Sequence, residues 1–235
     1  MKIILKNKVQ KKLLLLQRNE FLSPIQIKIR KLFGRSLFTS LFINYFQHNN
    51  LSEIISYEIE KEFNIFKNFI PKNIETVMDI GCGIGLINIF LNENYKNINQ
   101  FYLLDQNKID KKIKYGFSKN YESYNDLSAT KETLILNNID EKKINLIDVK
   151  KNYVIKEKSI DLVISLVSMG YHYPISNYIQ LLRKTCNNNT VFIFDIATEY
   201  QDLNIIKNYF NYYEILEKIE TKHPRLRLFC SGMIL

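Results

Sequence analysis

The stretch TVMDIGCGIG, residues 76–85, decides the fold class. It starts with a short apolar run that ends in an acid and a glycine, and its glycines stand at positions 81, 83 and 85. The next segment, residues 86–94, has apolar residues at helical spacing. A glycine-rich turn between a strand and a helix lets backbone N–H groups approach a ligand, and open α/β sheets bind nucleotide-like ligands at such turns. We therefore predict a strand, a ligand-binding turn and a helix over this region.

The glycine spacing excludes two phosphate-binding motifs. A dinucleotide fingerprint, G-x-G-x-x-G, would need its third glycine at position 86 or 88, where the chain has Leu86 and Asn88. The chain also lacks a G-x-x-x-x-G-K-S/T sequence, so a P-loop is excluded. The turn therefore indicates a ligand other than a simple dinucleotide or a nucleoside triphosphate.

Strand-like and helix-like segments alternate downstream of this turn. Apolar strand runs separated by amphipathic helices indicate a parallel sheet that is covered on both faces. The last two strand runs are joined by only five residues, 221–225, so they should form an antiparallel hairpin. We predict an α/β, Rossmann-like, doubly wound sheet of seven strands, mostly parallel with one antiparallel strand, over residues 76–235. The expected strands are 76–81, 100–105, 144–149, 159–166, 190–197, 213–220 and 226–234, and the expected helices are 86–94, 127–138, 175–186 and 199–209.

The first 75 residues form a basic extension in which helices are expected. Residues 52–70 show the pattern of one amphipathic helix, and residues 25–42 show a weaker one. Residues 1–40 contain ten Lys or Arg and one acid, whereas the rest of the chain carries 23 of each sign. The formal net charge of +9 therefore belongs to this arm. We expect a helical cover over residues 1–75 and a separate domain over residues 76–235.

Three roles for the basic arm stay open. It could cover the pocket for a substrate, lie on an anionic membrane surface, or bind RNA. The apolar run at 36–46 and the preponderance of lysine over arginine favour the cover first, peripheral membrane contact second and nucleic acid last. The longest apolar run is shorter than the roughly 20 residues that span a bilayer, and no secretory signal is recognisable. We expect a cytoplasmic protein, and the sequence leaves its oligomeric state open.

The cysteines and acids do not suggest a metal centre. Cys82, Cys186 and Cys230 are far apart and form no C-x-x-C pair. Asp148 and Asp195 lie near strand ends, but neither has a close acidic partner in the sequence. No metal site is predicted.

Four short motifs resemble those of the class I S-adenosylmethionine-dependent methyltransferases: VMDIGCGIG (77–85), YLLD (102–105), NLID (145–148) and DLVISL (161–166). The resemblance implies S-adenosyl-L-methionine as cofactor, with the glycine turn around its methionine and ribose. It implies that Asp105 accepts hydrogen bonds from both ribose hydroxyls and that Asp148 meets the adenine amino group, although a helix cap is the alternative for Asp148. The other implied cofactor residues are Asp79, Gly81, Gly83, Gly85, Gln106 and Val149.

The loop after the strand at 159–166 is expected beside the reacting methyl group, because carboxyl ends of strands form the site of such sheets. It contains His172, and a neutral imidazole with an unperturbed pKa of about 6.5 suits removal of a proton from a hydroxyl. The alternative is that His172 caps or packs under the following helix.

The wider stretch SLVSMGYHYPISNYI, residues 165–179, resembles the corresponding loop of a group of sugar O-methyltransferases. Two positions depart from that pattern: Val167 stands where arginine is frequent, and three asparagines at 187–189 replace a Pro-Gly-Gly turn. The resemblance implies an acceptor site that includes His172 as catalytic base with Tyr171, Tyr173 and Tyr124 as acceptor contacts. Tyr124 could equally belong to a loop that leads into the next helix, with Asp126 as its cap.

Together these features predict methyl transfer to a hydroxyl of a small molecule or of a sugar or glycan. An RNA or protein methyltransferase that uses the basic arm is one alternative. A cofactor-binding protein without catalysis is the other.

Overall fold

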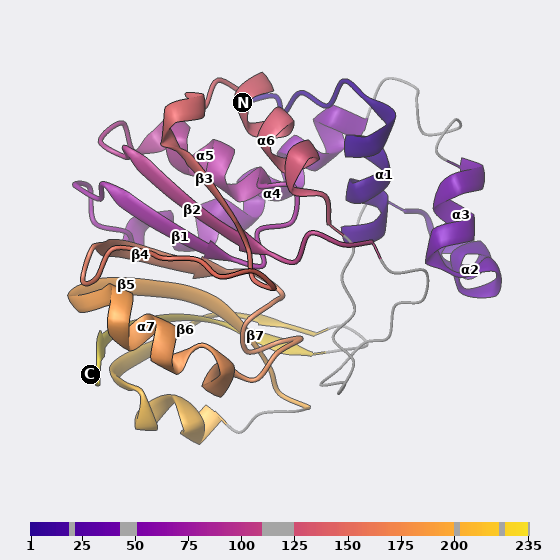
Figure 1. Ribbon diagram of the computed structural model, residues 1–235. Helices are drawn as coiled ribbons and strands as arrows, with labels where there is room; N and C mark the ends of the chain where they lie inside the picture. Colours follow the sequence, from indigo (N-terminus) through magenta and orange to yellow (C-terminus); the bar gives the residue numbers. More distant parts are fainter. Residues whose placement is uncertain (19–21, 43–50, 110–124, 200–202, 221–223, 235) are drawn as a thin grey trace.

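A computed structural model of the chain describes all residues except 19–21, 43–50, 110–124, 200–202, 221–223 and 235 (Figure 1). Tyr124 therefore lies outside the described residues. The described chain contains a seven-stranded sheet with the order β3-β2-β1-β4-β5-β7-β6. The strands are β1 (Thr76–Ile80), β2 (Gln100–Asp105), β3 (Ile144–Asp148), β4 (Ile160–Ser165), β5 (Cys186–Ala197), β6 (Phe210–Ile219) and β7 (Arg225–Met233).

The directions of the strands confirm the predicted fold class. β1 pairs in parallel with β2 and β4, and the parallel arrangement continues through β3 and β5. β7 is antiparallel to both of its neighbours, β5 and β6. The chain order reverses at β1, from which the strands run outward to β3 on one side and through β4 on the other, and this is where such sheets bind ligands.

The sheet is covered on both faces (Figure 1). Side chains of α1 (Lys8–Gln17), α4 (Leu51–Phe66), α5 (Leu86–Asn94) and α6 (Leu127–Leu136) share one buried apolar cluster with the sheet. The opposite face packs on α7 (Ile179–Thr185) and on the 3-10 helix η5 (Leu203–Asn208). Shorter 3-10 turns are η2 (Lys67–Phe69), η3 (Glu141–Lys143) and η4 (Ile175–Asn177).

Several element boundaries differ from the prediction. The segment 175–186 is split into η4 and α7, and the helix expected near 199–209 is the 3-10 helix η5. The asparagines at 187–189 lie inside β5, not in a turn before it. They form an irregularity of the β4–β5 ladder, in which Ile160 pairs with Cys186 and Leu162 with Val191. Side-chain oxygens take the N–H groups there, as in the 2.9 Å bond from Asn187 N–H to Thr190 Oγ1.

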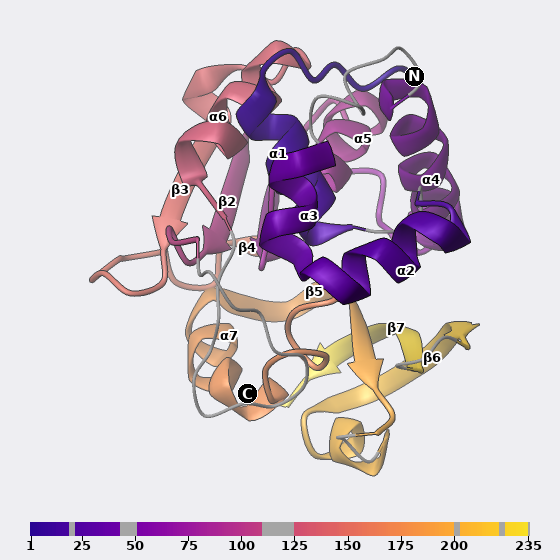
Figure 2. The ribbon, with the colours of Figure 1, turned by 90° about the vertical axis from the view of Figure 1, so that its right-hand side faces the viewer.

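The segment 25–42 forms two helices instead of one: α2 (Pro24–Phe33) and α3 (Arg35–Phe42). Ser23 and Gln26 cap α2 reciprocally, and Pro24 occupies its first turn. Gly34 breaks the helix because its φ of 77° lies in the left-handed region. Figure 1 shows the two helices at one end of the molecule, and in Figure 2 this end faces the viewer, with α3 against α1.

The extension shares its core with the sheet. Leu14 of α1 and Ile55 of α4 belong to the same apolar cluster as Val77 of β1. The division into residues 1–75 and 76–235 stays a prediction. Within the described residues, none of the helices combines the length and the apolar character needed to cross a membrane.

Candidate functional site

The glycine-rich turn follows β1 directly and adopts a conformation that requires glycine. Gly81, Gly83 and Gly85 have φ values of 75°, 53° and 77°, all in the left-handed region. The Gly81 N–H donates to the Leu104 carbonyl at 2.7 Å, which holds the turn against the end of β2. The turn then leads into α5, whose N-cap is Gly85.

Space as well as φ excludes a side chain at Gly81. A Cβ at this position would overlap the side chain of Ser168, which belongs to the loop after β4. The predicted cofactor turn and the predicted acceptor loop are therefore in direct contact. This contact joins the two parts of the candidate site.

The end of α1 also reaches the glycine turn. A Cβ at Gly83 would lie 2.6 Å from Oε1 of Gln17, and the same oxygen accepts a hydrogen bond from the Ile84 N–H at 3.2 Å. Gln17 Nε2 donates to Asn125 Oδ1 at 3.3 Å. Thus the basic extension contributes a side chain to the predicted cofactor turn.

Asp105, the last residue of β2, accepts hydrogen bonds from the glycine turn and from its neighbours. Its Oδ2 accepts from the Gly83 N–H at 2.9 Å and from Asn125 Nδ2 at 2.9 Å, and its Oδ1 accepts from the Gln106 N–H at 2.7 Å. Burial raises the pKa of Asp105 to about 6, although these three donors lower it. A carboxylate held in this way can accept a further donor from a ligand.

Asp79 lies behind the turn and is buried. Asn88 Nδ2 on α5 donates to Asp79 Oδ2 at 2.6 Å. Burial raises the pKa of Asp79 to about 7, against the opposing effect of the Asn88 hydrogen bond. Near neutral pH this side chain therefore exchanges between its charged and its protonated form.

Asp148 is the neighbour of Asp105 in the parallel β2–β3 register. Its Oδ1 accepts from the Lys150 N–H at 3.1 Å, so the carboxylate caps the turn after β3. The Val149 N–H donates to the Asp105 carbonyl at 3.0 Å, and its side chain is exposed. Asp148 and Val149 thus stand beside Asp105, at the position predicted for an adenine pocket.

The His172 loop is wound around one carbonyl group. The Ser168 carbonyl oxygen accepts from the N–H groups of Tyr171, His172 and Tyr173 at 3.1, 2.8 and 3.2 Å. The Tyr171 ring meets the His172 ring edge-on at 4.9 Å between centroids. His172 and Tyr173 are partly exposed, whereas Tyr171 is buried.

Val167 has a φ of 61°, which is rare and strained for a β-branched residue. It lies between the end of β4 and the His172 loop. Strained backbone of this kind concentrates at functional sites, where the surrounding structure enforces it. Val167 is also one of the two places at which the sequence departs from the sugar O-methyltransferase pattern.

A buried network of charges lies beside the acceptor loop. Asp195, at the end of β5, accepts from Arg227 Nε at 2.8 Å and from Arg227 Nη2 at 3.1 Å, and Arg225 Nε lies 3.1 Å from its Oδ2. The Arg225 guanidinium lies 5.7 Å from the centre of the Tyr171 ring. Arg225 belongs to the five-residue link predicted between the last two strands, where a solvated turn residue would be expected unless the fold brought it to the site. The ion pair with Asp195 and the contact with the Tyr171 ring bring it there.

The network continues to the extension. Arg227 Nη2 lies 3.8 Å from Oε1 of Glu62 on α4, and Oε2 of Glu62 is 2.8 Å from Nη2 of Arg18. Burial raises the pKa of Glu62, but the charges of Arg18 and Arg227 outweigh it and hold the pKa below its usual value. Charged groups therefore connect the end of α1 with β7, whose first residue, Arg225, lies beside Tyr171.

Two site residues were missed or misplaced by the sequence analysis. Asn125 follows Tyr124 in the segment that was predicted either to contact the acceptor or to lead into the next helix, but its amide binds both Asp105 and the Gly83 carbonyl, at 2.9 and 2.8 Å. Asp126 caps α6, as the alternative for that segment required. The sequence gave no sign that Gln17 belongs to the site, because its partner, Ile84, lies 67 residues away in the chain. Among the described residues, no group of three or more His, Cys, Asp or Glu is arranged to hold a metal ion.

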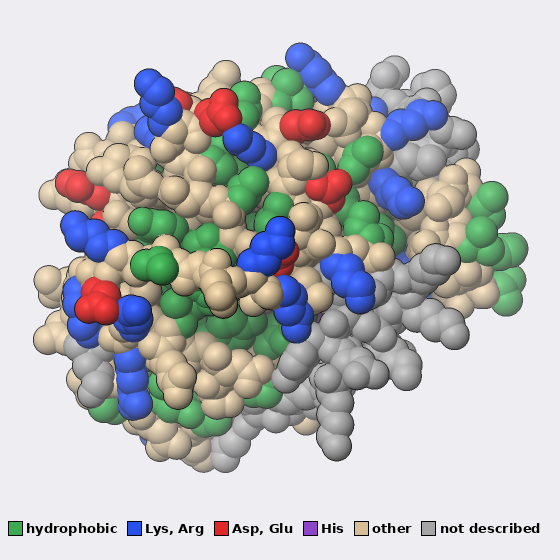
Figure 3. Space-filling model, viewed as in Figure 1, with side chains coloured by type: hydrophobic (Ala, Val, Ile, Leu, Met, Phe, Trp, Pro, Cys, Tyr) green, Lys and Arg blue, Asp and Glu red, His purple; other side chains and the backbone are tan. Residues whose placement is uncertain are grey.

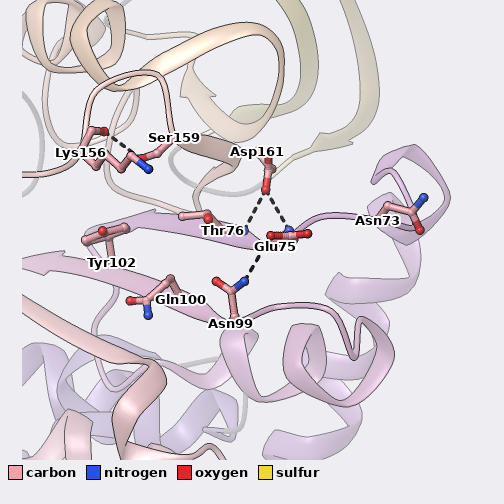
Figure 4. Close-up of a pocket in the computed structure, with 9 residues that line it drawn as sticks. All are labelled: Asn73, Glu75, Thr76, Asn99, Gln100, Tyr102, Lys156, Ser159 and Asp161. Carbon is pink, nitrogen blue, oxygen red and sulfur yellow. Dashed lines mark hydrogen bonds between the residues drawn. The ribbon is translucent and has the colours of Figure 1, made fainter.

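A separate hollow of about 470 Å³ opens at the amino ends of β1 and β2, at the edge of the sheet opposite the glycine turn (Figure 4). Asp161 closes one side of it by accepting from the N–H groups of Glu75 and Thr76. Because ligands of open α/β sheets bind at the carboxyl ends of the strands, this hollow is not the candidate site.

Comparison with known proteins gives a likeness in fold. No protein-family model matches the chain, and no curated protein sequence matches it. The tRNA methyltransferase TrmI from Aquifex aeolicus superposes with a TM-score of 0.50 at 15% identity, over 75% of this chain and 69% of that chain. TYW2 from M. jannaschii, solved in complex with AdoMet, gives 0.49 at 17% identity, over 75% and 76%. A precorrin-6y C5,15-methyltransferase from Geobacter metallireducens gives 0.48 at 13% identity, over 73% and 87%. The chain therefore has the Rossmann-like fold found in methyltransferases.

Proposed function

We propose that the protein is an S-adenosylmethionine-dependent methyltransferase that acts on a hydroxyl of a small molecule or of a sugar or glycan. The observation that carries the proposal is the pairing of Gly83 N–H with Asp105, at the point where the glycine turn meets the end of β2. A turn of three left-handed glycines against a buried carboxylate suits a ligand that carries both a charged amino acid part and ribose hydroxyls.

The described residues fit this cofactor. The glycine turn packs closely on the side chains of Ser168, Gln17 and Leu134. Asp105 offers a carboxylate at the edge of this turn, hydrogen-bonded to the Gly83 N–H. A carboxylate has about four acceptor positions, and donors from the described residues take three of those on Asp105. One ribose hydroxyl can therefore bind at Oδ1, and a second requires Asn125 to give up its bond. Asp148, Gln106 and Val149 would line the adenine side, with Asp79 behind the turn.

We assign His172 the role of general base for the acceptor hydroxyl. S-adenosylmethionine supplies the methyl group, and the protein must align the acceptor oxygen and remove its proton. The contact between Ser168 and the glycine turn supports this assignment, because it keeps the His172 loop next to the turn that is proposed to bind the cofactor. Tyr171 and Tyr173 flank the histidine and would pack on a sugar ring or hydrogen-bond to its hydroxyls. The role predicted for Tyr124 is kept in the proposal.

The N-terminal extension acts as a cover in this proposal. Gln17 contacts the glycine turn, and Arg18 links α1 to the charged network under the acceptor loop. TrmI, by its name, acts on tRNA, so an RNA acceptor is the competing outcome. Against it, the arginines of the arm point inward: Arg30 and Arg35 donate to the carbonyls of Arg18 and Leu16.

The test is a measurement of S-adenosylhomocysteine formed by the full chain from S-adenosylmethionine. Separate reactions contain free sugars and nucleotide sugars, unmodified tRNA transcript, or a protein mixture, and the product is analysed for the position of the new methyl group. Methylation of a hydroxyl in the sugar reactions supports the proposal. Methylation of tRNA or protein alone would overturn the acceptor class while leaving the cofactor assignment intact.

A further inference from the structure

The outer face of the α2–α3 hairpin is apolar and exposed. Leu32 of α2 is 80% exposed, and Leu37 and Leu41 of α3 lie on one helical stripe because they are four residues apart. In Figure 3 this apolar surface lies at the end of the molecule where Figure 1 places α2 and α3. The residues of this outer face are Ile25, Leu32, Phe33, Leu37 and Leu41.

The inner face of the hairpin already packs on the rest of the protein. The apolar residues of its outer face are therefore not the ones that form its core. Ile27 and Ile29 pack against a small buried cluster that contains Leu15, Leu22 and Phe38. Arg35 also anchors the hairpin through its 2.9 Å bond to the Leu16 carbonyl. These contacts fix the hairpin on α1 with its apolar side outward.

The charge of the hairpin has one sign. Residues 24–42 contain four basic residues and no acid. Two of them point inward, and the other two, Lys28 and Lys31, are exposed on α2. Lys28 lies between Ile25 and Leu32 on the same side of the helix, since it is three residues after the one and four before the other.

From this pattern we infer that the α2–α3 hairpin docks the protein on an anionic lipid surface. An apolar stripe bordered by lysines is the arrangement with which amphipathic helices lie in the interface of a bilayer. A second copy of the chain would bring lysines against lysines. A nucleic acid backbone would gain nothing from five large apolar side chains. Because Arg35 ties the hairpin to α1 and α1 reaches the glycine turn, docking would bring the candidate site to the membrane surface.

The experiment measures sedimentation of the full chain with lipid vesicles, and it does not depend on methyl transfer. One set of vesicles contains equal parts of phosphatidylcholine and phosphatidylglycerol, and the other contains phosphatidylcholine alone. Leu32→Ser should weaken binding to the anionic vesicles roughly tenfold, because one large apolar contact is lost. The double variant Lys28→Glu with Lys31→Glu should weaken it roughly tenfold or more, and added salt should weaken the wild type.

Matched controls separate docking from a general effect of the substitutions. Val154 is 87% exposed and lies outside the hairpin, so Val154→Ser should leave binding unchanged. Lys72→Glu with Lys142→Glu should do the same, since both lysines are exposed elsewhere. All variants should unfold at the temperature of the wild type. Absence of vesicle binding, equal binding to both vesicle types, or equal effects of hairpin and control variants would overturn the inference. So would self-association that Leu32→Ser abolishes in a protein that does not bind vesicles.

Discussion

The Gln17 side-chain oxygen accepts a hydrogen bond from the Ile84 N–H at 3.2 Å, which ties the last residue of α1 to the turn between β1 and α5. Replacing Gln17 with alanine removes this acceptor. We expect faster hydrogen exchange of the Ile84 amide, measured by NMR, because the bond that protects it is lost. Gln180→Ala, on the exposed side of α7, should leave this exchange unchanged. Unaltered exchange at Ile84 in the Gln17 variant would show that the cover does not rest on the turn.

Asp79 should lower the stability of the folded protein at neutral pH. Its pKa is raised from 3.8 to about 7 by burial, so the folded protein binds this proton more tightly than the unfolded chain. The free energy of unfolding contributed by Asp79 therefore falls as pH rises from about 4 to about 7. Asp79→Asn has the shape of the protonated form and should be as stable as the wild type near pH 4. Above pH 7 it should be more stable, on the order of a few kcal/mol.

Denaturant unfolding of the two proteins across this pH range measures the difference directly. The exposed control Glu93→Gln should show no such trend. A constant difference between wild type and Asp79→Asn at all pH values would contradict the raised pKa.

The Asp195–Arg227 pair should be essential for stability. Arg227 is fully buried and binds Asp195 with two nitrogens, so Arg227→Met leaves the carboxylates of Asp195 and Glu62 without this partner. Breaking a buried pair in this way costs about 3–5 kcal/mol, which should lower the melting temperature by roughly 10 °C. The exposed control Arg183→Met should melt close to the wild type. A melting temperature for Arg227→Met equal to that of the wild type would rule out the network as a support of the acceptor loop.

His172→Ala should separate catalysis from cofactor binding. Loss of a general base typically lowers turnover by about 10²–10⁴-fold, whereas the affinity for S-adenosylmethionine should stay within about twofold of the wild type. Turnover is followed with whichever acceptor proves active, and affinity is measured by calorimetry. Ser176→Ala, exposed in the next turn, is the matched control. Normal turnover in the His172 variant would leave the histidine with a packing role.

Local sequence patterns predicted the strands of the sheet well, because the secondary structure of these segments is largely set by residues close to one another in the chain. The bounds of β2 and α5 are those expected, since alternation, helical spacing and flanking turn residues all agree there. The pattern over 25–42 was continuous, but one glycine with positive φ divides it into two helices. The asparagines before β5 were read as a turn, whereas pairing with β4 draws them into the strand.

The candidate site was predictable only where its residues lie within one contiguous segment. The glycine turn and the His172 loop are contiguous, so their residues could be named from the sequence. Asn125 and Gln17 reach Asp105 and the turn only through tertiary packing, from positions 20 and 67 residues away from their partners. Arg225 likewise resembled a polar turn residue until the β5–β7 pairing placed it opposite Ala197 and near Asp195.

The central claim is that the glycine turn and Asp105 bind S-adenosylmethionine. Isothermal titration of the full chain with this cofactor tests it most directly, with Asp105→Ala as the variant and Asp140→Ala, exposed after α6, as the control. We predict saturable binding to the wild type and to the control, and binding weakened by roughly tenfold or more in Asp105→Ala, as expected when a charged acceptor of hydrogen bonds is lost. No binding by the wild type, or equal binding by Asp105→Ala, would contradict it.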